Sequence, residues 1–161
     1  MLIRRAVQGD IAFLDRLLYQ VAAVHGAIRP DLFRSGAKKY TDGELLLLIG
    51  DDEKPIFVAE ENGIPLGYCF CAFQRHKSDG ALCDFDSLYI DDLCVDEDAR
   101  GRHVGTALYE YVKAFARESG CYNLTLNVWS GNDGARAFYD SMGLKATEDD
   151  AGSAAVKRTL P

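Results

Sequence analysis

Two acidic residues and a loop of arginines and glycines stand close together in the middle of this chain. Asp91 and Asp92 interrupt a largely apolar run, Phe85 to Val95, and Arg100-Gly101-Arg102-His103-Val104-Gly105 follows soon after. A carboxylate beside a reacting group can serve as a general base. Glycines let the backbone approach a phosphate closely, and arginines add positive charge. The segment therefore predicts an anion-binding loop next to a candidate base.

The elements around this loop predict how it is held. Residues 85–95 alternate as a strand, and residues from 104 onward carry apolar side chains on one helical face. The first N–H groups of a helix lack intrahelical partners and carry partial positive charge. The loop lacks the lysine of a P-loop and the Gly-x-Gly-x-x-Gly of a dinucleotide site. The Arg100 and Arg102 side chains either contact phosphates or form an exposed basic turn that balances the acidic residues 96–98.

A second segment with a chemical pattern lies downstream. Residues 122–129 alternate as a strand, and Asn132 is a suitable N-cap for a helix that ends at Gly143. This helix carries Ala135, Phe138 and Tyr139.

Together, the two segments resemble the acetyl-coenzyme A (acetyl-CoA) binding motifs of the GNAT superfamily of N-acetyltransferases. Arg100 and Gly105 match the ends of its Arg/Gln-x-x-Gly-x-Gly/Ala pattern, and His103 stands where glycine is usual. Histidine tolerates left-handed backbone better than most residues. The resemblance implies that Asn132 contacts the pantetheine arm and that Tyr139 lies near the thiol sulfur. The cofactor-binding residues it implies are Leu93, Cys94, Val95, Arg100, Gly101, Arg102, His103, Val104, Gly105, Thr106, Asn132, Ala135, Phe138 and Tyr139.

The reaction that the resemblance implies needs a neutral amine and a protonated leaving thiolate. An alkylamine titrates near 10.4, so its deprotonation at pH 7 costs roughly 4–5 kcal/mol without help. Tyr139 is the candidate proton donor to the thiolate, although it could instead be half of a Phe-Tyr core pair. Asp91 and Asp92 are the candidate bases, and strand alternation predicts that they point to opposite faces. Similarity to polyamine-type members slightly favours Asp91, while both could equally be solvated or paired with basic side chains.

The remaining expectations for the site come from the resemblance. Backbone groups of Leu93 and Val95 would pair with the pantetheine amides and polarise the thioester carbonyl. His25, Arg29 and Trp129 are weaker candidates for the acceptor entrance. A small cationic amine is the favoured acceptor. The alternatives are a protein or peptide N-terminal or lysine acetyltransferase, and a non-catalytic module that binds an acyl-CoA. A homodimer is the usual form in this family.

The rest of the chain predicts an α/β architecture. We expect a strand at 2–6, a helix capped by Asp10 and ended by Arg29-Pro30, and a helix over 41–49 with a Thr41/Glu44 capping box. A hairpin follows through Asn62-Gly63, and a last strand covers 154–160. The resemblance implies one domain over 1–161. Its central sheet is mixed and mostly antiparallel, has helices on both faces, and is splayed between the fourth and fifth strands.

Composition narrows the class of protein. The chain has 161 residues, 48% hydrophobic and 27% charged, as in ordinary globular proteins. A net charge of −7 disfavours a general nucleic-acid surface. The five cysteines are expected to be free thiols in a reducing compartment, and no metal-ligand cluster is apparent. We expect no signal peptide and no apolar run long enough to cross a bilayer, which favours a cytoplasmic location.

Overall fold

A seven-stranded sheet forms the centre of the computed structural model, which describes residues 1–34, 36–78, 80–81, 83–147 and 153–160. The strand order is β1-β2-β3-β4-β5-β7-β6, and every neighbouring pair is antiparallel except β4 and β5. The mixed, mostly antiparallel sheet is therefore confirmed. The strands are β1 (Leu2–Arg5), β2 (Ile56–Glu61), β3 (Ile64–His76), β4 (Phe85–Val95), β5 (Asn123–Trp129), β6 (Lys145–Thr147) and β7 (Ser153–Thr159).

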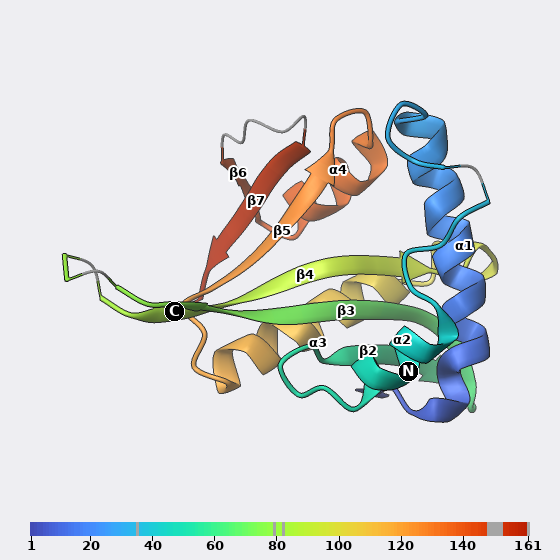
Figure 1. The fold of residues 1–161 in the computed structure, drawn as a ribbon, viewed down its shortest axis with the longest axis horizontal. Coiled ribbons are helices and arrows are strands. Elements are labelled where there is room, and N and C mark those ends of the chain that lie inside the picture. Colours follow the sequence, from blue (N-terminus) through green and yellow to red (C-terminus); the bar gives the residue numbers. More distant parts are fainter. Residues whose placement is uncertain (35, 79, 82, 148–152, 161) are drawn as a thin grey trace.

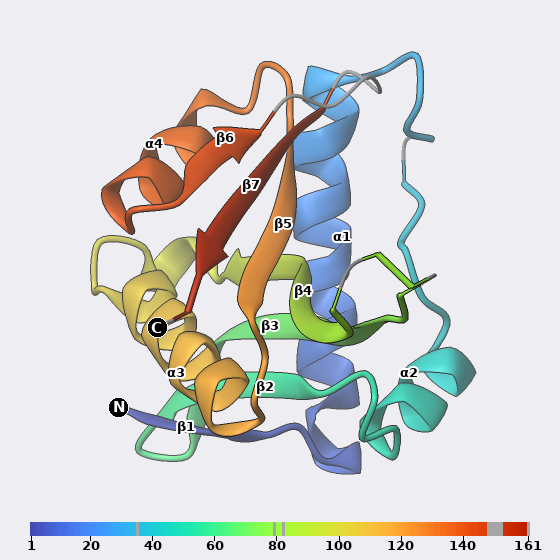
Figure 2. The ribbon, with the colours of Figure 1, turned by 90° about the vertical axis from the view of Figure 1, so that its left-hand side faces the viewer.

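Helices cover both faces of this sheet, as expected. Figure 2 shows α1 (Ile11–Ile28) and α2 (Asp42–Ile49) on one side, with α3 (Val104–Glu118) and α4 (Asp133–Ser141) on the other. Strand alternation divides the core between the two sides. On β3, Tyr68 and Phe70 pack in the cluster of α1 and α2, whereas Cys69 and Cys71 pack in the cluster of α3. The α1–α2 side of the sheet is called the acceptor face below, and the α3–α4 side the cofactor face.

The sheet opens between β4 and β5. These strands pair in parallel only from Ser87–Ile90 to Asn123–Leu126. Beyond Ile90, β4 stays paired with β3 up to Val95, while β5 continues to Trp129 beside β7. Figure 1 shows the two strands diverging toward α1. The expected splay is thus confirmed, and the edge of β4 that faces β5 is left unpaired over its second half.

Local sequence signals set several boundaries as expected. Asn62 and Gly63 adopt φ values of 53° and 77° in the β2–β3 hairpin. The Thr41 side chain accepts the Glu44 N–H at 3.3 Å, and the Glu44 carboxylate accepts the Thr41 N–H at 2.7 Å. Asn132 caps α4 by accepting the Ala135 N–H at 3.2 Å. Each of these contacts joins residues that are close in the sequence, so a local sequence pattern can predict them.

One expectation about the elements is wrong, and one strand was missed. Asp10 stands at the N-cap of α1 but does not cap it with its side chain. Its carboxylate instead accepts the Arg4 guanidinium at 2.7 Å and the Val7 N–H at 2.8 Å. The strand β6 was not expected from the sequence, because three residues are too few to show alternation.

The expectation about apolar runs also needs correction. Residues Gln8–Ile28 form one helical stretch that is long and apolar enough, by length and composition only, to cross a membrane. In this fold Leu14, Leu17 and Leu18 of the same stretch are fully buried in the core of the acceptor face. These three leucines of α1 therefore pack on the sheet.

Candidate active site

A hollow of about 270 Å³ lies where β4 leads into α3. Its wall combines the end of a strand, the following loop, the first turn of a helix and one aromatic ring from α4. The lining residues are Val95, Ala99, Arg100, Gly101, His103, Val104, Gly105, Thr106 and Phe138. Most of the residues expected to bind the cofactor therefore lie around one concave surface.

The backbone of this loop is shaped to receive an anion. Gly101 and His103 both have left-handed backbone, with φ values of 76° and 59°. Histidine thus adopts the conformation that glycine would adopt more easily, as the sequence predicted. The first hydrogen bond of α3 runs from the Ala107 N–H to the His103 carbonyl at 3.0 Å. The amides of residues 104–106 precede that bond and have no helical carbonyl to reach, so the positive end of α3 lies at the hollow.

Gly105 keeps the floor of the hollow open. A Cβ atom on this residue would lie 3.5 Å from the Phe138 ring and 3.6 Å from Val95 Cγ2. That is ordinary contact distance, so an added methyl group would fill space against these side chains. The first-turn amides of α3, the glycine floor and the nearby arginine fit the diphosphate of CoA.

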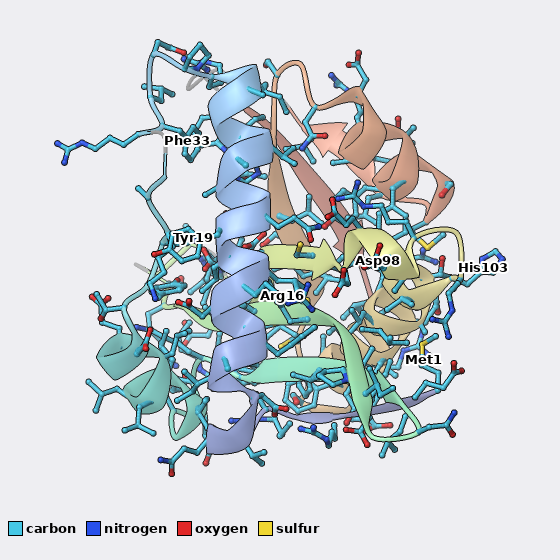
Figure 3. The ribbon with its side chains drawn as sticks, turned by 90° about the vertical axis from the view of Figure 1, so that its right-hand side faces the viewer. Met1, Arg16, Tyr19, Phe33, Asp98 and His103 are labelled. Carbon is cyan, nitrogen blue, oxygen red and sulfur yellow. The ribbon has the colours of Figure 1, made fainter. Side chains whose placement is uncertain are left out.

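The two arginines of the loop have different surroundings. Arg100 lines the hollow, whereas Arg102 forms an ion pair with Glu61 of the β2–β3 hairpin. Figure 3 shows His103 at the outer edge of the loop, away from α1. Of the alternatives raised by the sequence, the phosphate role suits Arg100, and Arg102 balances a carboxylate distant in sequence.

Sequence reasoning missed a link between α1 and the end of β4. Arg16 of α1 forms an ion pair with the buried Asp96, and this hydrogen bond lowers the pKa of that carboxyl. Gln20 donates to the Val95 carbonyl at 3.2 Å. Figure 3 shows Arg16 pointing from α1 toward the loop that carries Asp98. This link fixes the start of the anion-binding loop against the helix of the acceptor face.

The two candidate bases lie on the same face, so the alternation argument was wrong. A β-bulge between β3 and β4 pairs Phe70 with Asp92 and Cys71 with Ile90, which leaves Asp91 as the extra residue. A bulge shifts strand alternation by one residue and bends the strand. Asp92 consequently shares the acceptor face with Phe70, and Asp91 bonds to Tyr40, whose ring stacks on Phe70 at 5.6 Å. The bulge also lies where β4 leaves β5.

The carboxylate pair is held by phenols and one lysine. The Tyr68 hydroxyl donates to Asp92 at 2.8 Å. The Tyr40 hydroxyl donates to Asp91 at 2.8 Å, and the Lys39 ammonium bonds the other Asp91 oxygen at 2.7 Å. Burial raises the pKa of Asp92 to about 6, although the Tyr68 hydrogen bond opposes the rise. Asp92 is therefore a carboxylate poised to accept a proton near neutral pH.

Tyr139 lies on the cofactor face. It is buried, and its ring packs edge-on against Phe138 at 5.0 Å and Tyr109 at 6.5 Å. Burial raises the pKa of Tyr139 well above that of a free phenol, with a further contribution from the nearby Asp92 carboxylate. A phenol held in its neutral form can donate a proton. Tyr139 therefore belongs to the core, and its hydroxyl stays protonated at neutral pH.

The three weaker acceptor candidates gather at the far end of α1. The His25 ring lies 5.1 Å from Phe33, and Phe33 meets Trp129 edge-on at 5.4 Å. The Arg29 guanidinium lies 5.8 Å above the Trp129 ring and also pairs with Asp31. Burial lowers the pKa of His25. Figure 3 shows Phe33 beside the upper part of α1. The cluster thus joins α1 to the end of β5, opposite the end of β4.

Comparison with known proteins agrees with this geometry. The Acetyltransferase (GNAT) family matches residues 22–144, which span both halves of the site. The chain belongs to this family. The match extends from the middle of α1 to Leu144, just before β6, and so includes the bulge, the loop and Tyr139.

Several known proteins are similar to this member of the GNAT family. It is 32% identical over 113 residues to an uncharacterised N-acetyltransferase of Methanocaldococcus jannaschii, a match that covers 69% of the chain and 48% of that relative. It thus spans about half of that protein. It is 26% identical to a thialysine N-epsilon-acetyltransferase of Bos taurus, over 90% of the chain and 84% of the relative.

Solved structures share the fold. A mutant form of a Bacillus halodurans protein superposes with a TM-score of 0.87 and 26% identity, over 93% of this chain and 96% of that one. A PaiA N-acetyltransferase from Thermoplasma acidophilum, solved with coenzyme A, superposes with a TM-score of 0.79 and 14% identity, over 98% of each chain. At that identity the second comparison shows the fold alone.

Proposed function

We propose that this GNAT protein transfers the acetyl group of acetyl-CoA to a primary amine by direct attack within a ternary complex. The single observation that carries the proposal is the opening between β4 and β5. The carboxylates Asp91 and Asp92 lie on the acceptor face of the sheet at this opening. The buried phenol of Tyr139 and the anion-binding loop lie on the cofactor face. An amine and a thioester could meet there from opposite sides.

Asp92 is the proposed base for the incoming amine. With a pKa of about 6 it is largely ionised at pH 7, yet basic enough to take a proton as the nitrogen attacks. Sequence similarity had slightly favoured Asp91. We prefer Asp92 because Asp91 already bonds Lys39 and Tyr40, which suits the binding of a cationic group.

The cofactor face has its own proposed roles. The amides of residues 104–106 and Arg100 bind the diphosphate, and Asn132 contacts the pantetheine arm with the amide nitrogen left over from capping. The unpaired edge of β4 at Leu93 and Val95 adds backbone hydrogen bonds along that arm and polarises the thioester carbonyl. Tyr139 protonates the departing thiolate.

A small cationic amine is the proposed acceptor class. Two adjacent carboxylates and the aromatic residues Tyr40, Phe33 and Trp129 suit an ammonium group, which is attracted to both. The name of the Bos taurus relative, an enzyme acting on a lysine analogue, supports the same class. Acetylation of a protein amine is the alternative. We also propose that the protein is cytoplasmic and forms a homodimer.

The first test is a calorimetric titration with acetyl-CoA, using NADH and ATP as controls. Selective binding of acetyl-CoA would support the cofactor assignment. A thiol-release assay over a panel of diamines, amino acids and peptides would then identify the acceptor. Binding without turnover on any amine would favour a regulatory acyl-CoA-binding module, and absence of binding would refute the proposal.

A further inference from the structure

The ammonium group of Lys39 lies inside the proposed acceptor site. Its Nζ atom is 2.7 Å from Asp91 Oδ1, while the Tyr40 hydroxyl holds the other oxygen of that carboxylate at 2.8 Å. Burial raises the pKa of Asp92, and the Lys39 charge partly offsets that rise, which places the ammonium near both carboxylates. Chemically, the Lys39 side chain is a primary alkyl ammonium, the class of group proposed as the substrate.

The surroundings of Lys39 leave it able to react. It belongs to the segment between α1 and α2, its side chain is 45% exposed, and Asp91 is its ion-pair partner. Asp91 follows directly after Ile90, the last residue of β4 that pairs with β5. The nitrogen therefore lies on the acceptor face, beside the first residue of the opening.

We propose that Lys39 is a self-acetylation site, so that its Nζ accepts the acetyl group when acetyl-CoA is present and no free amine competes. The inference rests on the proposed function, because it uses the same carboxylates and the same donor. A tethered amine at the site also gains from proximity, since the step is unimolecular once the cofactor is bound.

The step balances with groups already described. The Lys39 ammonium gives one proton to the Asp92 carboxylate, and its nitrogen forms a bond to the acetyl carbon as the carbon–sulfur bond breaks. The Tyr139 hydroxyl protonates the departing thiolate, and the second proton lost from the nitrogen restores the phenol. The products are a neutral N-acetyl-lysine and free CoA thiol, and Asp92 passes its proton to water.

Self-acetylation would also change the acceptor site. The acetylated side chain has no positive charge, so its ion pair with Asp91 is lost. A free cationic amine would then meet an Asp91 carboxylate that has lost its ion pair with Lys39. We expect the acetylated protein to show a lower KM for such an amine than the unmodified protein shows.

The test is to incubate the purified chain with acetyl-CoA without added amine and to follow intact mass and peptide masses. We expect one acetyl group at Lys39, formed at a rate per molecule that does not depend on protein concentration. Lys77 is the control for uncatalysed acetylation, because its side chain is 76% exposed and lies far along the chain in another loop. The neighbouring Lys38, paired with Asp15 and Asp42, is the control for position in the segment.

Variants sharpen the result. Lys39→Arg keeps the charge but offers no acetylatable amine, so it should abolish the mass increase, whereas Lys38→Arg should not. Asp92→Asn should slow modification of Lys39 without changing that of Lys77. Equal acetylation of Lys39 and Lys77, or none at Lys39, would overturn the inference. If thiol release with an added diamine persists in that case, the proposed function stands; if it is also absent, both fail.

Discussion

Removal of the hydroxyl of Tyr68 should move the acid limb of the pH–rate profile to higher pH. Tyr68 is fully buried and donates to Asp92 at 2.8 Å. A hydrogen bond to the charged form of a carboxyl lowers its pKa, so Tyr68→Phe raises the pKa of Asp92 above its value of about 6. The ring remains to pack against Phe70, at 4.9 Å between centroids.

The size of this shift follows from the energy of the lost bond. A hydrogen bond to a charged group contributes about 1.5–3 kcal/mol, and one pKa unit corresponds to about 1.4 kcal/mol. The pKa of Asp92 should therefore rise by roughly one to two units. The ionised fraction at pH 6 would fall about five- to fifty-fold, while near pH 9 the loss would be only slight.

The assay is kcat/KM for thiol release between about pH 5 and about pH 9, with one amine used throughout. Tyr40→Phe is the matched control, because that phenol bonds Asp91 on the same face. We expect Tyr40→Phe to leave the acid limb near its original position. If Tyr40→Phe moves the limb and Tyr68→Phe does not, Asp91 is the base and the reasoning on Asp92 is refuted.

Four other variants test the cofactor face. Gly105→Val should raise the Kd for acetyl-CoA at least about tenfold, because the branched side chain of valine meets Phe138 and projects into the hollow. If calorimetry gives the variant the same affinity as the unmodified protein, the result would count against the anion-binding loop. Tyr139→Phe should lower kcat about ten- to a hundredfold with little change in the Kd for acetyl-CoA, and unchanged turnover would remove its role as proton donor. Arg100→Ala should weaken acetyl-CoA binding about three- to tenfold, whereas Arg102→Ala, whose partner is Glu61, should not; similar losses in both would show that Arg102 also reaches the phosphates.

Features that depend on neighbouring residues could be predicted from the chain. The Thr41/Glu44 box, the Asn132 cap and the Asn62-Gly63 turn each join residues a few positions apart. The left-handed backbone at His103 belongs to the same group, because it is set by the short loop before α3. Such interactions are local, so the residue types alone indicate them. The family motifs are short for the same reason, and they located the anion-binding loop.

Contacts between distant segments were decided only by the tertiary structure. The bulge at Asp91 depends on how β4 registers with β3, and a slip of one residue reverses the face of every side chain that follows. The pairs Arg16–Asp96 and Lys39–Asp91 join residues 80 and 52 positions apart. Long-range pairing of this kind leaves no periodic pattern in either segment. The sequence by itself determined the family, the elements other than β6, and the candidate groups. The packing of α1, β3 and β4 decided that both carboxylates share one face, because only strand register and side-chain burial fix where a carboxylate points and how readily it takes a proton.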